Sequence, residues 1–124
     1  MIVYDTGALI AAERSERELW ALHDAALRRG VAPIVPAAVL AQAWRGGPQA
    51  GLSRLLTGCS VVPLDEGTAR AAGVLCGRVG SDDVVDASVV AVAQAVGAAV
   101  VTGDADDLAQ LIRAVGADIE LHEI

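Results

Sequence analysis

The sequence of 124 residues contains no lysine and no phenylalanine, and aromatic residues make up only 2% of it. Its hydrophobic residues, 54% of the chain, are therefore mainly alanine, valine and leucine. Such residues suit helices packed against a parallel sheet, whose buried strands are rich in β-branched side chains. With so few aromatic rings, we expect no track of stacking platforms for single-stranded nucleic acid.

Long apolar runs and a cysteine framework are also missing. No apolar run approaches 18 residues, so we expect no membrane span, and "MIVYDTGALI" lacks the basic start of a signal peptide. Cys59 and Cys76 are 17 residues apart and form no CxxC pair, which favours a reducing cytoplasm. Their spacing from His23 and His122 does not support a zinc site, and we expect buried thiols and surface histidines.

The charge of the chain is one-sided. Sixteen acidic residues against nine arginines give a formal net charge of −7. An acidic protein does not bind nucleic acid through its bulk charge. Either nucleic acid is not the ligand, or bound divalent cations offset the acids locally.

Apolar segments typical of strands alternate with segments whose apolar spacing predicts helices. The expected strands are residues 2–5, 31–35, 60–64, 98–102 and 118–124. The expected helices are residues 7–13, 15–30, 36–44, 49–57, 65–79, 82–96 and 107–115. Ser15 with Glu18 resembles a capping box, Ser81 or Asp82 is expected to cap the helix over 82–96, and Pro33 indicates an edge or irregular strand. This order predicts one α/β domain, residues 1–124, with a mostly parallel sheet.

Acidic residues follow these elements where parallel strands would end together. Asp5 ends the first strand, and Asp104 follows the fourth, with Asp107 three residues later. Asp83 and Asp86 lie three apart on the first turns of the helix before that strand. Each alone could be a helix cap, but a carboxylate after a buried strand needs partners. We therefore expect one shared acidic site at the carboxyl ends of the strands.

Several carboxylates in one pocket raise one another's pKa, and a divalent cation reverses that repulsion. An all-oxygen site without histidine or cysteine selects Mg²⁺ or Mn²⁺ rather than zinc. Such ions activate a bound water and stabilise the oxygens of a phosphodiester during hydrolysis. The acids therefore favour a metal-dependent phosphodiesterase.

Four segments, in order, resemble the PIN-domain ribonucleases, and more narrowly the toxins of bacterial VapC-type toxin–antitoxin pairs. They are "IVYDTGALIAA", "VPAAVLAQAWRGG", "DVVDASVVAVA" and "VVTGDADDL". The resemblance implies a three-layer α/β/α domain and an endoribonuclease that uses Mg²⁺ or Mn²⁺ bound by Asp5, Asp86 and Asp104, with Asp107 assisting. It also implies RNA as substrate, a cognate antitoxin, and a homodimer.

The chain departs from the family at one position, where Gln42 stands in place of a glutamate. One charge fewer weakens cation affinity and puts a second metal in doubt. Asp83 could compensate or could simply cap its helix. Thr102 could orient a water or phosphate or be an ordinary strand residue, and Arg45 could contact an RNA phosphate or the carboxyl end of its helix.

Other classes fit less well. Receiver domains and haloacid-dehalogenase phosphatases resemble this chain in their strand-end aspartates, but they have a lysine and a second acid that are missing here. The alternative from a different class is a PIN-fold module that binds RNA or an antitoxin without cleaving. A catalyst should fail with chelator and in Asp86→Ala, whereas a binding module need not. We also expect Asp5→Ala or Asp86→Ala to stabilise the metal-free fold.

Overall fold

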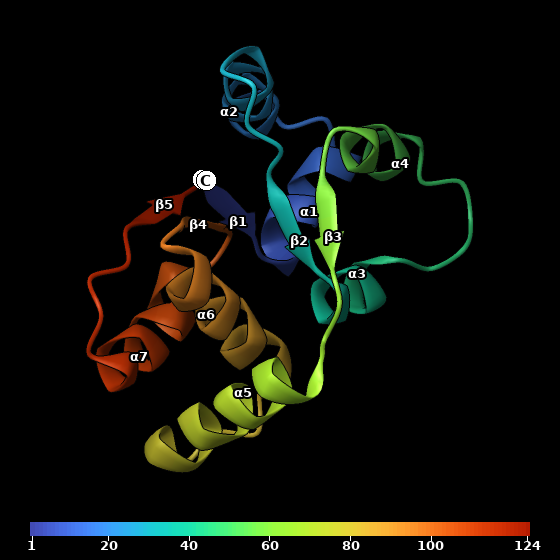
Figure 1. Ribbon diagram of the computed structural model, residues 1–124. Coiled ribbons are helices and arrows are strands. Elements are labelled where there is room, and N and C mark those ends of the chain that lie inside the picture. The colour runs from blue at the N-terminus through green and yellow to red at the C-terminus, as the bar shows by residue number, and fades with distance from the viewer.

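A computed structural model describes residues 1–124 and contains one five-stranded sheet (Figure 1). The strand order is β3-β2-β1-β4-β5, and every neighbouring pair is parallel. The strands are β1 (Ile2–Tyr4), β2 (Ile34–Pro36), β3 (Ser60–Val62), β4 (Ala99–Thr102) and β5 (Leu121–Glu123). The predicted parallel sheet is confirmed, with shorter strands than expected.

Seven helices connect and cover the strands. They are α1 (Thr6–Glu13), α2 (Arg17–Arg28), α3 (Ala37–Ala43), α4 (Ala50–Thr57), α5 (Glu66–Val79), α6 (Val84–Val96) and α7 (Ala105–Val115). α1 packs on β1 and β4 together with α2 and α4, whereas α6 packs on β1, β2 and β4 between α5 and α7. The result is the three-layer α/β/α arrangement, and none of the helices combines the length and hydrophobicity that spanning a bilayer requires.

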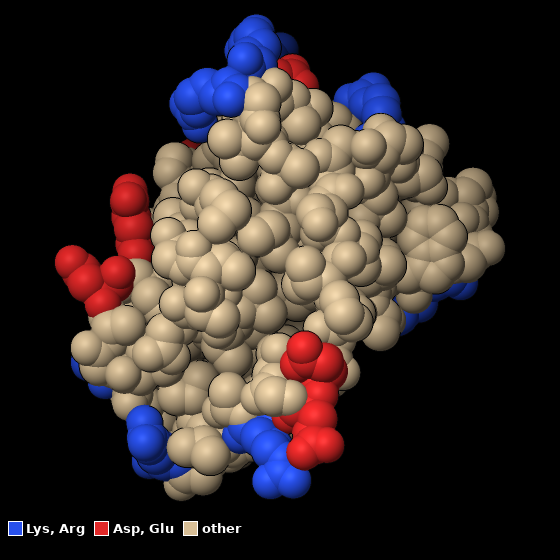
Figure 2. Space-filling view, in the orientation of Figure 1, with Lys and Arg blue, Asp and Glu red and all other residues tan.

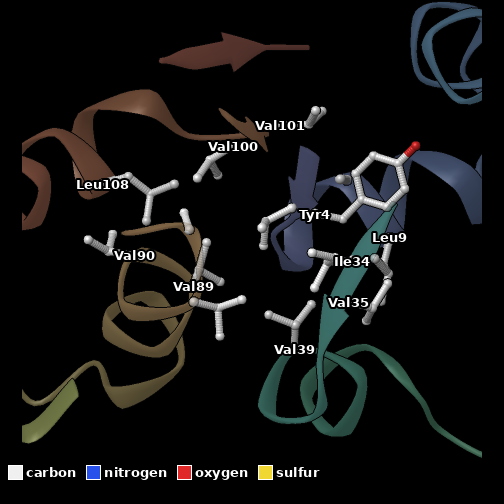
Figure 3. Packing of buried hydrophobic residues seen from close by; sticks show 14 of the residues in the cluster. Tyr4, Leu9, Ile34, Val35, Val39, Val89, Val90, Val100, Val101 and Leu108 are labelled. Carbon is white, nitrogen blue, oxygen red and sulfur yellow. The ribbon is translucent and has the colours of Figure 1, made fainter. Parts of the chain in front are cut away.

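The core is one cluster of 25 buried residues, built almost entirely from valine, alanine and leucine. Figure 3 shows Val89 and Val90 of α6 beside side chains of the strands and of α7. The valine spacing over residues 82–96 predicts a helix, and in α6 seven consecutive residues, Ala87 to Ala93, are buried. This helix is enclosed because the sheet, α5 and α7 all pack against it.

Three local expectations are wrong. Pro33 does not mark an edge strand, because β2 lies between β1 and β3 and the Pro33 carbonyl accepts from the Ser60 N–H at 2.8 Å. The capping box at Ser15 does not form, because α1 and α2 are joined so closely that Ser15 adopts a φ of 58° and Glu16 becomes the N-cap. Asp83 rather than Ser81 or Asp82 caps α6. Ser81 instead accepts a hydrogen bond from the Asp83 N–H.

His23 is not a surface residue, contrary to expectation. It is 2% exposed, and its Nδ1 lies 2.9 Å from the Tyr4 hydroxyl, with which it shares a hydrogen bond. The Trp20 ring contacts His23 edge-on, and Arg54 lies over Trp20 at 4.0 Å from the ring centroid. A polar side chain can be buried here because its ring nitrogen is paired, and this pairing ties α2 to the strand that precedes Asp5.

Candidate functional site

The centre of the sheet contains a topological switch point. The chain runs outward from β1 through β2 to β3, and then returns to the other side of β1 to form β4 and β5. β1 and β4 are therefore hydrogen-bonded neighbours whose outgoing connections leave in opposite directions. In open parallel sheets, ligand sites form beyond the carboxyl ends of such strands. Asp5 and Thr102 occupy this position.

The Asp5 carboxylate is buried and held from several sides. Its Oδ2 accepts from the Thr102 hydroxyl at 2.5 Å, and its Oδ1 accepts from the Ala8 N–H at 2.9 Å, capping α1. Burial raises the pKa of Asp5, while hydrogen bonds from Thr102 and from the backbone of Ala8, Gly103 and Gly7 oppose the rise. The carboxylate is therefore fixed in orientation but is not relieved of its desolvation cost.

Two glycines bring the first turn of α1, which follows β1, into contact with the turn after β4. A Cβ at Gly7 would lie only 2.8 Å from the Cα of Gly103, and a Cβ at Gly103 would lie 3.1 Å from the Cα of Gly7. Only glycine allows the two backbones to approach this closely. The contact places the turn that leads to Asp104 beside the start of α1, which Asp5 caps. Sequence analysis did not predict this contact, although Gly103 directly precedes Asp104 and Gly7 lies two residues after Asp5.

Thr102 also fixes the start of α7. Its hydroxyl oxygen accepts from the Asp104 N–H at 2.9 Å, and the Asp104 carboxylate accepts from the Asp107 N–H at 3.4 Å. The charge of Asp104 is the main cause that raises the pKa of Asp107. Glu123, at the end of β5, accepts from the Ala105 N–H at 3.1 Å and adds a carboxylate that sequence reasoning missed. Thr102 thus orders both Asp5 and Asp104 by direct contact.

Asp83 and Asp86 lie at the start of α6, across a cleft from the start of α7. The Asp83 carboxylate accepts from the Asp86 N–H at 3.0 Å, which confirms that Asp83 caps α6. Burial raises the pKa of Asp86 to about 7, with further contributions from Asp83 and from the charges of Asp5 and Asp107. A cleft of about 210 Å³ separates the starts of α6 and α7, and its polar lining is Ser81, Asp83, Asp86, Asp106, Asp107 and Gln110.

Asp5, Asp83 and Asp107 act together on Asp86, because the charges of all three raise its pKa. No three acidic, histidine or cysteine side chains already surround a common point as a metal site. Mg²⁺ needs only one or two carboxylates, since it retains several waters. Oxygen donors that repel one another therefore fit a hydrated Mg²⁺ or Mn²⁺ ion. The set does not fit a histidine- or cysteine-bound metal.

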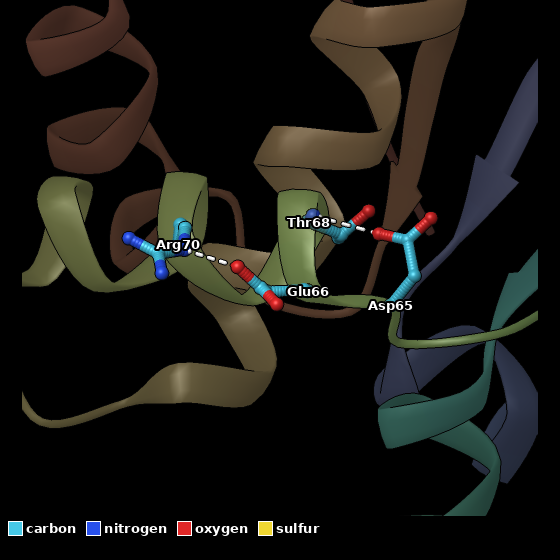
Figure 4. A network of polar contacts seen from close by, with 4 residues as sticks. All are labelled: Asp65, Glu66, Thr68 and Arg70. Atoms are coloured by element: carbon cyan, nitrogen blue, oxygen red, sulfur yellow. Dashed lines mark hydrogen bonds and ion pairs between the residues drawn. The ribbon is translucent and has the colours of Figure 1, made fainter.

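Not every acid belongs to this set. Asp65 accepts from the Thr68 N–H at 2.8 Å and caps α5, and Glu66 forms an exposed ion pair with Arg70 at 2.7 Å (Figure 4). Each of these side chains is accounted for by a helix cap or an ion pair within α5. They provide comparison positions for the aspartates at the switch point.

Gln42, in α3, and Arg45, just after α3, were candidates for contact with metal or RNA, and both side chains bind other parts of the protein. Gln42 Oε1 accepts from the Thr6 hydroxyl at 2.5 Å, so Gln42 lies beside the residue that follows Asp5. The Arg45 guanidinium donates to the carbonyls of Ala41 at 3.3 Å and Trp44 at 2.8 Å. Arg45 therefore serves the carboxyl end of its own helix, which favours the structural interpretation over an RNA contact.

An apolar groove lies away from the acids. Its volume is about 370 Å³, and it is lined by Ala37, Leu40, Ala41, Trp44 and Leu56. The Trp44 side chain is 41% exposed, so this part of the groove is open to a partner. Figure 2 shows that the charged side chains of the visible face lie at its margins and leave the centre uncharged.

The chain is similar to known proteins both in its sequence pattern and in its fold. The family model described as "PIN domain" matches residues 2–113. The solved structure of VapBC2 from Rickettsia felis bound to a promoter DNA fragment aligns with a TM-score of 0.76 at 15% identity, covering 100% of this chain and 99% of that one. FitAB bound to an IR36 DNA fragment gives 0.68 at 16%, covering 99% and 94%. FitAcB from Neisseria gonorrhoeae gives 0.66 at 15%, covering 99% and 97%. No curated protein sequence matches the chain.

Proposed function

The chain belongs to the PIN-domain family, and we propose that it is a metal-dependent endoribonuclease, the toxin of a toxin–antitoxin pair, with residues 1–124 as its one catalytic domain. The observation that carries this proposal is the coupling of aspartates from three elements at the switch point. The Thr102 hydroxyl contacts both the Asp5 carboxylate and the Asp104 backbone N–H, and the charges of Asp5 and Asp107 help to raise the pKa of Asp86.

The residues proposed to hold Mg²⁺ or Mn²⁺ are Asp5, Asp86 and Asp104, with Asp107 and Asp83 contributing charge from the outer side. When bound, such an ion supplies a water of lowered pKa and stabilises negative charge on phosphodiester oxygens. The chain's own part is orientation. Thr102 fixes the Asp5 carboxylate toward β4, and the contact of Gly7 with Gly103 keeps the start of α1 beside the turn that leads to Asp104.

The net charge fits this proposal. Five of the 16 acidic residues are assigned to the cation site, and a cation there removes the main electrostatic obstacle to a polyanionic substrate. The substrate class is RNA, as in the ribonucleases that the sequence resembles. Arg45 is not assigned to RNA, because its guanidinium is engaged by helix carbonyls.

The test is cleavage of total bacterial RNA by the purified protein in Mg²⁺ or Mn²⁺. Discrete fragments that disappear with chelator and in Asp86→Asn, but persist in Asp65→Asn, are the expected result. Asp65 is a suitable control because it is an aspartate whose carboxylate caps α5 through the Thr68 N–H. A folded protein that cleaves no RNA would instead favour the non-catalytic binding module, with Gln42 as the missing charge.

The proposed protein partners are an antitoxin and a second copy of the chain. Two structural neighbours, VapBC2 and FitAB, are bound to DNA in their solved structures. Here the open groove around Trp44 is the surface we assign to an apolar antitoxin segment. Co-purification with the product of the adjacent gene, lost in Trp44→Asp and retained in Arg28→Asp, would support the assignment. Sedimentation of the purified chain would test the homodimer.

A further inference from the structure

The bond between Thr6 and Gln42 decides what Gln42 can offer to the site. Thr6 follows Asp5 directly and is the first residue of α1, and its hydroxyl donates to the Gln42 amide oxygen at 2.5 Å. This is the side-chain hydrogen bond that Gln42 makes within the protein, and its amide nitrogen is left with two donors and no protein acceptor. The side chain is exposed, so a ligand can reach that nitrogen.

The chemistry of the free atom differs between glutamine and glutamate. A glutamate bonded to Thr6 in the same way would present its second carboxylate oxygen, which can bind a cation. Glutamine presents an NH₂ group, which donates hydrogen bonds and does not coordinate Mg²⁺ or Mn²⁺. At this position an amide nitrogen can therefore donate to an anion where a carboxylate oxygen would bind a cation.

We propose that Gln42 binds the substrate phosphate rather than the metal, with its amide nitrogen donating to a non-bridging phosphodiester oxygen. Thr6 is the positioning residue, because it holds the amide oxygen and so turns the nitrogen outward. Hydrogen bonds to charged oxygens are stronger than those to neutral acceptors. The loss of one carboxylate also removes repulsion between this side of the site and the phosphate. This inference rests on the proposed nuclease function.

The neighbouring arginine is not available to contact the phosphate, whereas the neutral Gln42 side chain is. Arg45 is the arginine closest to Gln42 in the chain, and its guanidinium donates to the carbonyls of Ala41 and Trp44. It is therefore held by its own helix rather than offered to a ligand. An amide donor beside Asp5 can contact a phosphate without neutralising the carboxylates that the cation needs.

The first test measures the Mn²⁺ dissociation constant by titrating the protein with Mn²⁺ alone in a calorimeter. We expect Gln42→Ala to change the Mn²⁺ dissociation constant by less than about twofold, and Gln42→Glu to tighten it roughly tenfold because a carboxylate oxygen is restored. Gln94→Ala is the matched control, since Gln94 is an exposed glutamine of α6. Weakening of about fivefold or more in Gln42→Ala would identify a metal ligand and overturn the inference.

The second test is filter binding of bulk bacterial tRNA in Ca²⁺. Gln42→Ala should weaken tRNA binding about tenfold, Gln42→Glu should weaken it further, and Gln94→Ala should leave it unchanged. Thr6→Val should weaken tRNA binding while leaving Mn²⁺ affinity unchanged, which a purely structural role for Thr6 would not produce. Equal tRNA binding by the wild-type protein and Gln42→Ala would overturn the inference.

The two proposals fail in different ways. If the wild-type protein binds Mn²⁺ no better than Asp86→Asn, the proposed nuclease site fails. If the wild-type protein binds Mn²⁺ through Asp86 but Gln42→Ala loses that affinity, the nuclease proposal stands and only the assignment of Gln42 to phosphate fails.

Discussion

Thr102 donates its hydroxyl hydrogen to the Asp5 carboxylate across the junction of β4 and β1, with the two oxygens 2.5 Å apart and both residues buried. The sequence places these residues 97 positions apart. Parallel pairing of β1 with β4 brings them together at the point where both strands end.

Thr102→Val should lower activity and stability together. It keeps the β-branched shape but leaves the Asp5 carboxylate without its hydroxyl donor, a loss that typically costs about 1–3 kcal/mol for a buried charged acceptor. Thr102→Ser retains the hydroxyl and should retain most of the activity. Chemical denaturation and RNA cleavage measure the two effects. Equal stability of the valine and serine variants would contradict the role assigned to the hydrogen bond.

Asp86→Asn should stabilise the metal-free protein while abolishing cleavage. Burial and neighbouring carboxylates raise the pKa of Asp86 to about 7, so its ionisation disfavours the fold. The folded chain holds a proton that the unfolded chain releases near pH 4, and the free energy of unfolding therefore falls as pH rises from about 4 to 7. After allowance for solvent screening, the effect is on the order of 1 kcal/mol. Denaturation in chelator should show this slope in the wild-type protein and a flatter one in Asp86→Asn.

Asp5→Asn should have the opposite effect on stability. The sequence alone leads us to expect that neutralising either Asp5 or Asp86 stabilises the metal-free fold. Burial raises the pKa of Asp5 as it does that of Asp86, but Asp5 also accepts hydrogen bonds from Thr102 and from the N-terminus of α1, and these hold the fold together. Replacing one carboxylate oxygen by an NH₂ group disturbs these contacts. A melting temperature in chelator that rises in Asp5→Asn would contradict the structural role assigned to this carboxylate.

His23 should make the protein less stable in mild acid. Burial lowers the pKa of His23 from its ordinary value of 6.5, aided by Arg54 and opposed by Asp24. As pH falls through 6.5, the unfolded chain takes up a proton that the folded chain still excludes, so the free energy of unfolding declines. His23→Gln should remove this component of the pH dependence. An identical decline between about pH 7 and 5 in both proteins would refute it.

Gly7→Ala should impair the site because its Cβ would meet the Gly103 backbone at 2.8 Å. We expect destabilisation of about 1–3 kcal/mol and a large loss of cleavage, since the start of α1 and the turn that leads to Asp104 must separate. Gly73→Ala is the matched control, because a Cβ there meets nothing within 4 Å and α5 gains helix propensity. Unfolding curves should move in opposite directions for the two variants.

Much of this arrangement is predictable from the sequence, because valine-rich runs and strand-end acids obey local rules. The parallel sheet shows this, since strands that alternate with helices leave few other arrangements. What escapes prediction depends on distant partners. The burial of His23 requires the Tyr4 hydroxyl, the contact of Gly7 with Gly103 joins α1 to the turn after β4, and the orientation of Gln42 depends on Thr6. None of these leaves a periodic signal in the chain.

The most direct test of the account is anomalous diffraction from crystals of the wild-type protein soaked in Mn²⁺. The account predicts a peak beyond the carboxyl ends of β1 and β4, within about 2.5 Å of carboxylate oxygens from at least two of Asp5, Asp86 and Asp104. The Gln42 amide nitrogen should lie outside that coordination shell. A peak confined to other acids, such as Asp118 and Glu120, or no peak at a saturating Mn²⁺ concentration, would contradict the cation site on which the proposed function rests.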